Sequence, residues 1–384
     1  MHQASETPLP ANLDTPCVVV DEARLHSNIA AMQARANQWN VALKPHVKTH
    51  KCLEIARMQL EMGSAGLTAA KVDEALVFLA AFFPPPAVTL AYPLVSGAKL
   101  DRLIVGAGNA DLILAADSET GVDILSLGAQ RHDRQLKVML KVDVGLHRCG
   151  VPPEDPRLVD LAKRIHKAKG LELAGILSHA GHSYAAQDAR EARLLAQKEA
   201  EAMTRAKERI EAAGIPVREV SVGATPTLLA ARDFGPATEI RPGNYVFLDR
   251  ACIRLGLAEP RHCALYVVAT VVSVNPEHAI LDAGSKTLSS DSGAHGAKGL
   301  EGYGLAWPLA DAAYESKPLV IEKLSEEHGF LRLSPEADFS PEVGDMVRIL
   351  PNHACAVANL AEGFLVAGPS KETYWDVAAR AKVR

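Results

Sequence analysis

Short apolar runs alternate eight times with stretches of helical periodicity between residues 41 and 254. The runs lack a strict in–out alternation, which is typical of strands that are covered on both faces. Together with the following helical stretches they indicate repeated β/α units. Eight units over roughly 230 residues predict an α/β fold with a (β/α)₈ TIM-type barrel, and a doubly wound sheet is the alternative. The predicted strands are residues 41–45, 66–68, 88–92, 112–116, 137–144, 173–178, 219–222 and 239–240.

The pattern changes after Arg254, where strand-like runs follow one another with Pro and Gly turns and little helical periodicity. This change predicts a second, mostly β domain. We expect strands at residues 265–274, 279–282, 319–321, 346–350 and 363–366. The β-branched run at residues 18–20 is a candidate for the same domain. We therefore expect a barrel domain over 22–252 and a discontinuous β domain over 1–21 plus 253–384.

Composition narrows the class of protein. A net charge of −5 over 384 residues gives no electrostatic reason to expect a nucleic-acid partner. Six cysteines without any CxxC spacing indicate reduced thiols and a cytoplasmic location. Residues 75–95 carry no charge, but the prolines at 84–86 cannot continue a helix, so we expect no membrane span. The N-terminus shows no signal peptide.

The stretch 43–51 ends the first predicted barrel strand and holds three lysines and two histidines. Side chains at the carboxyl ends of barrel strands are where this architecture places its chemistry. Lys48 could form a Schiff base if burial and neighbouring positive charge lowered its pKa. The alternative is an ordinary basic surface loop.

Two later strand ends predict an anion or phosphate cradle. Gly223 and Thr225 follow one strand and open a helix, where close backbone approach and N–H groups favour an anion. Gly243, Asn244 and Tyr245 follow the next strand, and late strand tips commonly bind phosphate in barrels. The alternative is a plain Thr-capped helix.

Other strand ends carry polar side chains whose roles the sequence leaves open. His179 and His182 flank a glycine and are either metal ligands or hydrogen-bonded loop residues. Tyr184 could position a heteroaromatic ring. Arg148 is a candidate anion or ring contact, or part of an ordinary salt bridge.

His353 and Cys355 follow the predicted strand at 346–350. If extended structure continues, side chains at i and i+2 point to the same face. Imidazole with thiolate suits zinc, whereas a buried structural cysteine is the alternative.

Taken together in this order, the motifs resemble the D-serine dehydratase and D-threonine aldolase group of pyridoxal-phosphate enzymes, which have the alanine-racemase-type fold. The resemblance runs from Thr15-Pro16 to His353-Ala354-Cys355 and covers nearly the whole chain. It also includes the segments 45–49, 178–181, 282–284 and 327–329.

The resemblance implies pyridoxal 5′-phosphate with Lys48 as the Schiff-base lysine. It implies phosphate-binding loops at Gly223–Thr225 and Gly243–Tyr245, contacts from Arg148, His179 and Tyr184, and metal ligands at His353 and Cys355. It further implies a small D-amino acid substrate and a homodimer.

The members of this group differ at the second metal ligand. The dehydratases resemble this chain, with His-x-Cys and zinc, whereas the aldolases typically show His-x-Asp and a harder ion such as Mn²⁺. Cys355 therefore favours a zinc-dependent dehydratase that converts D-serine or a related 3-hydroxy-D-amino acid to a 2-oxo acid and ammonia. A metal-activated D-threonine-type aldolase is the alternative, and a non-catalytic pyridoxal-phosphate carrier is disfavoured by the residues after Arg254.

Overall fold

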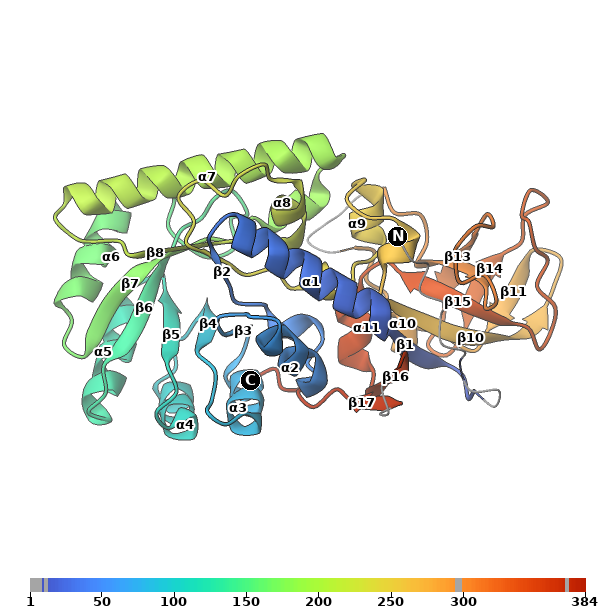
Figure 1. Ribbon diagram of the computed structural model, residues 1–384, viewed down its shortest axis with the longest axis horizontal. Helices are drawn as coiled ribbons and strands as arrows, with labels where there is room; N and C mark the ends of the chain where they lie inside the picture. Colours follow the sequence, from blue (N-terminus) through green and yellow to red (C-terminus); the bar gives the residue numbers. More distant parts are fainter. Residues whose placement is uncertain (1–8, 10–12, 294–298, 370–372) are drawn as a thin grey trace.

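The computed structural model describes residues 9, 13–293, 299–369 and 373–384. A helix-covered barrel occupies one end of the molecule and a β-rich unit the other (Figure 1). The long helix α7 (Ala189–Ala212) runs along the outside of the barrel, and the C-terminus returns to the barrel beside α3 (Val72–Ala81).

Eight parallel strands form the barrel in the order β2-β9-β8-β7-β6-β5-β4-β3. Backbone hydrogen bonds from Ala65 N to Leu43 O and from Thr68 N to Pro45 O, each 2.8 Å long, join the two ends of this sheet. The predicted (β/α)₈ barrel is therefore confirmed. The strands are β2 (Ala42–Leu43), β3 (Leu67–Ala69), β4 (Val88–Pro93), β5 (Leu112–Ala116), β6 (Leu136–Lys141), β7 (Leu171–Leu177), β8 (Glu219–Val222) and β9 (Glu239–Ile240).

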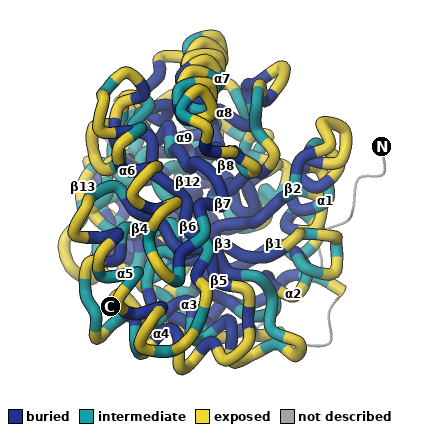
Figure 2. Tube along the Cα trace, turned by 90° about the vertical axis from the view of Figure 1, so that its left-hand side faces the viewer, coloured by how far each residue is buried: buried dark blue, intermediate teal, exposed yellow. Residues whose placement is uncertain are grey.

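The barrel helices bury one face against these strands and expose the other, as the view from the barrel end shows (Figure 2). Several begin at side chains that accept a hydrogen bond from the first helical turn, among them Asp21, Ser96 and Ser118. The other helices around the barrel are α1 (Glu22–Gln38), α2 (Leu53–Glu61), α4 (Gly97–Ala107), α5 (Glu119–Arg131), α6 (Pro156–Lys167) and α8 (Thr225–Ala230).

A nine-stranded sheet builds the second unit, in the order β11-β14-β13-β12-β15-β10-β1-β16-β17. Strand β1 pairs antiparallel with β10 and parallel with β16, so the run at residues 18–20 does join this sheet. The strands are β1 (Cys17–Asp21), β10 (Leu265–Val274), β11 (His278–Leu281), β12 (Gly304–Pro308), β13 (Leu319–Leu324), β14 (Gly329–Arg332), β15 (Met346–Pro351), β16 (Gly363–Ala367) and β17 (Tyr374–Asp376).

Three of the motifs that carry the resemblance have structural roles in or beside this sheet. Thr15 Oγ1 donates to Asp282 Oδ2 at 2.7 Å, and Thr270 N donates to Asp282 Oδ1 at 2.8 Å. A Cβ on Gly284 would lie 2.3 Å from Glu326 O, so this close backbone approach requires glycine. The segment 326–329 forms the turn between β13 and β14, with Ser325 N donating to His328 O.

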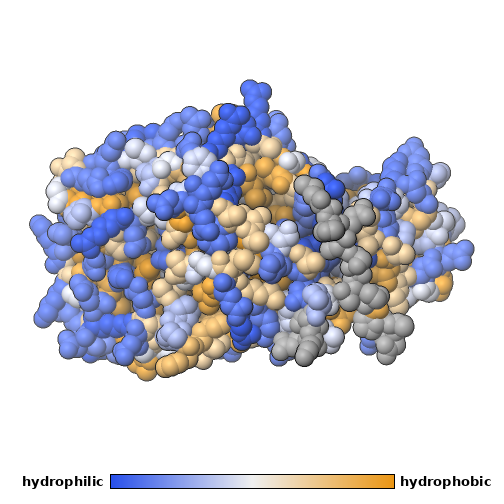
Figure 3. All heavy atoms as spheres, viewed as in Figure 1, coloured by the Kyte–Doolittle hydropathy of each residue, from blue (hydrophilic) through white to orange (hydrophobic). Residues whose placement is uncertain are grey.

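Short helices lie between the two units: α9 (Arg250–Arg254), α10 (Ser285–Leu288) and α11 (Ala354–Leu360). Hydrophilic residues cover the outer barrel helices and the far end of the β unit, and apolar residues gather toward the middle of this face (Figure 3). No helix in the described part of the chain is long and apolar enough to cross a membrane.

The close approach of β7 to β8 makes Gly175 a test of the barrel. A Cβ at this position would lie 1.9 Å from Glu219 O, so the strands would have to separate. We expect Gly175→Ala to lower the free energy of unfolding by about 1–3 kcal/mol. Gly97→Ala is the control, because a Cβ there meets nothing within 4 Å. Urea unfolding followed by circular dichroism measures both, and equal midpoints for the two variants would contradict this packing.

Candidate active site

The three lysines of the stretch 43–51 have different surroundings. Lys44 Nζ lies 2.6 Å from Glu239, and Lys51 Nζ lies 3.0 Å from Glu74; both carboxylates are buried. Lys48 lies in the single-turn helix η1 (Val47–Thr49), and no carboxylate of the described residues forms an ion pair with it. Lys48 is therefore the member of this set whose amine is available for chemistry.

The surroundings of Lys48 favour its neutral form. Burial lowers the pKa of the Lys48 ammonium below its usual range, and the charges of Arg148 and Arg241 act in the same direction. Cys355 and Glu74 oppose this shift. A neutral lysine amine is the form that can attack a carbonyl carbon.

Lys48 lines a cavity of about 390 Å³ at the carboxyl ends of the barrel strands. Residues from the barrel loops and from the β unit line this cavity together. The lining residues are His46, Lys48, Thr49, His179, Tyr184, Ala224, Thr225, Arg241, Gly243, Asn244, Asp291, Gly293, His353, Cys355 and Ala356. This volume suits a ligand the size of a small cofactor with a substrate.

His353 and Cys355 both line the cavity, but the backbone that carries them differs from the extended conformation considered from the sequence. The chain is not extended here: His353 is the residue that precedes helix α11, and Cys355 lies in its first turn. The two side chains still meet at the cavity, and Cys355 Sγ lies 3.4 Å from Thr49 Oγ1, next to Lys48. The i, i+2 argument was wrong in its geometry, because β15 ends at Pro351 and helix α11 begins at Ala354, directly after His353.

A carboxylate that the sequence did not single out accompanies His353. Asp291 Oδ2 lies 2.6 Å from His353 Nδ1. Burial lowers the pKa of His353, but the proximity of Cys355 and the hydrogen bond with Asp291 outweigh it and raise the pKa. Among the described residues no three His, Cys, Asp or Glu side chains form a ready metal cage. The protein therefore offers two candidate ligands here, with Asp291 hydrogen-bonded to the imidazole of one of them.

The two loops of the predicted phosphate cradle contact other residues of the barrel. His179 Nδ1 lies 2.9 Å from Gly223 O, which links two neighbouring strand ends. Gly223 has a φ of +136°, a conformation that glycine adopts without strain. A Cβ on Gly243 would lie 2.6 Å from Thr49 Oγ1, so this loop lies against the turn that carries Lys48.

The cavity brings together eight of the residues that the sequence singled out. Four others lie outside its lining. Gly223 is not among the lining residues, although the next residue, Ala224, is. Tyr245 is buried, and its hydroxyl accepts a hydrogen bond from Gln59 Nε2 at 3.0 Å. Arg148 is exposed, and it acts on Lys48 through its charge. His182 also lies outside the lining.

Sequence reasoning missed Arg241 and Asp291 as lining residues. Arg241 is buried, and its guanidinium donates to Ser221 Oγ at 2.6 Å and to the carbonyl oxygen of Ser178. Its place before Gly243 was a signal that could have identified it. Asp291 lies in a loop without a local motif, so only the fold brings it to His353.

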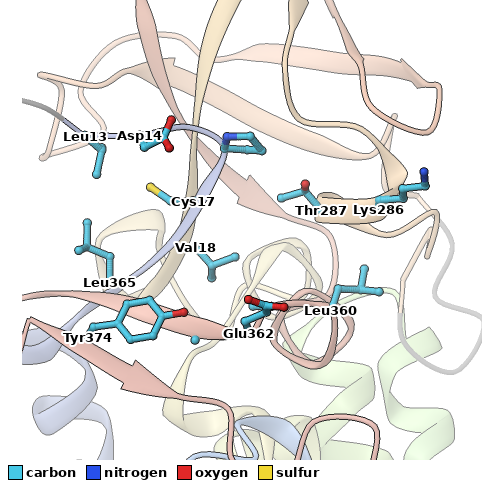
Figure 4. A pocket seen from close by; sticks show the side chains of 13 residues that line it. Leu13, Asp14, Cys17, Val18, Lys286, Thr287, Leu360, Glu362, Leu365 and Tyr374 are labelled. Atoms are coloured by element: carbon cyan, nitrogen blue, oxygen red, sulfur yellow. The ribbon is translucent and has the colours of Figure 1, made fainter.

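A second hollow of about 440 Å³ lies on the β unit between β1, β16 and β17 (Figure 4). Leu13, Val18 and Leu365 line it with Glu362 and Tyr374. Glu362 and Tyr374 are exposed. None of the predicted site residues lies in it.

This combination defines a barrel enzyme of the alanine-racemase-like fold, with a lysine at the first strand end and a β unit that closes the cavity. The family model for the alanine racemase N-terminal domain matches residues 20–251, and that for a putative serine dehydratase domain matches residues 264–367. The chain belongs to the D-serine dehydratase and D-threonine aldolase group within that fold family.

Three relatives illustrate the group. D-threo-3-hydroxyaspartate dehydratase of Delftia sp. (strain HT23) is 35% identical over 90% of this chain and 91% of its own length. The solved structure of that enzyme matches with a TM-score of 0.86 over 95% of this chain and 97% of its own. D-serine dehydratase of Dictyostelium discoideum is 31% identical (92% and 93% covered), and D-threonine aldolase of Arthrobacter sp is 30% identical (96% and 93% covered).

The environment of Lys48 makes a prediction for the cofactor-free protein. Because its pKa is lowered, the neutral amine is available at a lower pH than for an ordinary lysine. We expect a small amine-acylating reagent to modify Lys48 before exposed Lys163 at about pH 7–8. Peptide mapping by mass spectrometry across pH measures both rates. Faster labelling of Lys163 throughout this range would contradict the proposed environment of Lys48.

Proposed function

We propose that this protein is a lyase that uses pyridoxal 5′-phosphate and zinc to convert D-serine, or a related 3-hydroxy-D-amino acid, to a 2-oxo acid and ammonia. The observation that carries the proposal is that Lys48, which forms no ion pair with any described residue, shares one cavity with His353 and Cys355. We further propose the barrel domain as residues 22–252, the β domain as the remainder, and a homodimer as the working assembly.

The cavity residues fit the cofactor. Lys48 offers an amine whose lowered pKa favours attack on an aldehyde. Thr225, Gly243 and Asn244 line the same cavity, where backbone and hydroxyl groups suit a phosphate. His46 Nδ1 and Asn244 Oδ1 are buried without a hydrogen-bond partner among the described residues, as expected of a site that binds a polar ligand. Tyr184 and His179 also line the cavity, and we assign them to contacts with the pyridine ring of the cofactor.

The pair of His353 and Cys355 fits zinc. Imidazole nitrogen and cysteine sulfur are both ordinary zinc ligands, and a thiolate selects zinc over manganese or magnesium. Two protein ligands leave further positions for water or substrate. The solved structures that this chain resembles include a D-threo-3-hydroxyaspartate dehydratase mutant with cysteine replaced by alanine, described as metal-free. That description supports a metal role for Cys355.

The positions of Lys48, His353 and Cys355 in one cavity suggest a role for each in the reaction. Lys48 would hold the cofactor and, once the substrate amine displaces it, would take the α-proton as general base. Pyridoxal phosphate, when bound, supplies the electron sink for the charge left on Cα. His353 and Cys355 would hold the ion beside the β-hydroxyl, where a Lewis acid assists departure of that hydroxyl. Lys48 and Cys355 lie on adjacent elements, so both act on the same substrate.

An aldolase remains the second candidate, because D-threonine aldolase of Arthrobacter sp is similar over nearly the same length as the dehydratases. The same lysine and ion would serve it, but the β-hydroxyl would lose its proton and the Cα–Cβ bond would break. Cys355 argues for elimination, since the softer ligand set favours zinc. The products separate the two reactions.

Replacing Lys48 tests the centre of the site. We expect Lys48→Ala to lose the visible absorbance of the lysine-bound cofactor and to turn over at least 10³-fold more slowly, because base and anchor are both removed. Lys163→Ala serves as the exposed control and should keep both properties. Turnover of Lys48→Ala near the wild-type rate would remove Lys48 from this role.

Replacing Cys355 tests the metal half separately. We expect Cys355→Ala to retain cofactor absorbance while losing bound zinc and at least 10²-fold in oxo-acid formation, because the Lewis acid is lost. Exposed Cys149→Ala is the matched control. Zinc content by atomic absorption, with oxo acid assayed in parallel, measures the effect. Full elimination activity in metal-free Cys355→Ala would exclude the zinc step.

A further inference from the structure

The segment with the two candidate metal ligands is held from the barrel side by a pair of consecutive residues, Asp249 and Arg250. We propose that these two are positioning residues that fix His353 and Cys355 relative to the cofactor cradle. We call them the Asp249–Arg250 clamp. This inference rests on the proposed function and concerns residues that touch neither substrate nor cofactor.

Arg250 holds the residue before His353. Its Nη1 donates to Asn352 Oδ1 at 2.5 Å and to Glu301 O at 3.0 Å, and Asn352 Nδ2 in turn donates to Gly302 O at 2.8 Å. Arg250 and Asn352 are both buried. Because Asn352 is 1% exposed, loss of the Arg250 guanidinium would leave the Asn352 amide oxygen buried without this donor.

Asp249 holds the residue after His353. The backbone N–H of Ala354 donates to Asp249 Oδ2 at 3.0 Å, and Asp249 is 1% exposed. His353 itself provides no side-chain cap for helix α11. A carboxylate from the barrel therefore supplies the hydrogen bond that fixes the first turn of this helix, in which Cys355 lies.

The same Asp249 oxygen also holds the cradle. Asn244 Nδ2 donates to Asp249 Oδ2 at 2.8 Å, and the backbone N–H of Ala251 donates to Oδ1 at 3.1 Å. One buried carboxylate thus joins the loop that carries Gly243 and Asn244 to the start of the helix that carries Cys355. The clamp sets the distance between the two halves of the active site.

The two members of the clamp predict separable effects. Among the described residues, the Arg250 side chain donates hydrogen bonds to Asn352 and Glu301 and to no residue of the cradle, so Arg250→Met is expected to weaken zinc binding about 10- to 100-fold and leave cofactor affinity unchanged. Arg250→Lys, which keeps a donor, is expected to retain most of the zinc affinity. Asp249→Asn is expected to weaken both zinc and cofactor binding, because it disturbs both halves.

The experiment uses the full-length protein. Zinc affinity is measured by competition with a chromophoric chelator, cofactor affinity by absorbance titration with pyridoxal phosphate, and folding by circular dichroism and thermal melting. Asp188→Asn is the matched control, since Asp188 caps α7 on the barrel surface and contacts neither half of the site. It is expected to change the melting temperature only.

Each outcome decides between the claims. Weaker zinc binding in folded Arg250→Met with unchanged cofactor affinity supports the clamp. If the wild type binds zinc and folded Arg250→Met and Asp249→Asn bind it equally tightly, the clamp is only structural and the inference is overturned alone. A wild-type protein that binds no zinc overturns the proposed metal role, and the inference with it.

Discussion

The candidate active site depends on the contact between helix α11 of the β unit and the single turn η1 of the barrel. Cys355 Sγ lies 3.4 Å from Thr49 Oγ1, and Thr49 follows Lys48 directly. This contact brings residues more than 300 positions apart in the chain to one cavity. Neither unit alone holds both the reactive amine and the candidate metal ligands, so the docking of the two units creates the site.

Burial of charge inside the barrel distinguishes Lys48, which we propose as the reactive lysine, from its neighbours. Lys44 and Lys51 are buried and form ion pairs with Glu239 and Glu74, respectively. These ion pairs offset the cost of removing the two ammonium groups from water. Lys141 has no such partner among the described residues; its Nζ donates to Ala91 O, and burial lowers its pKa to about 8. Lys48 combines a lowered pKa with access to the cavity, and that combination distinguishes it from the other three.

Much of the fold could be predicted from the sequence because the eight apolar runs of the barrel are locally distinct. The strands β12, β14 and β17 were missed, since they are short and β12 begins with Gly304 and ends with Pro308. Periodicity also could not show that helix α11 begins directly after His353. Its first turn is fixed by Asp249, which is distant in sequence.

The residues of the candidate site also include some that the sequence could identify and some that it could not. Lys48, His353 and Cys355 stand in dense local motifs and could be identified before the fold was known. Tyr245 belongs to such a motif as well, yet its hydroxyl bonds to Gln59, and a pattern of residue types does not show where a side chain points. Asp291 has no local signal, because its meaning comes only from its contact with His353.

The most direct test of the account is product analysis of the purified protein with D-serine, threo-3-hydroxy-D-aspartate and D-threonine, each with and without a chelator. We expect a 2-oxo acid and ammonia in equal amounts, with their formation lost in the presence of chelator and restored by zinc. Relative rates would identify the preferred substrate. Glycine with an aldehyde as the products would contradict the elimination and assign the aldolase reaction instead.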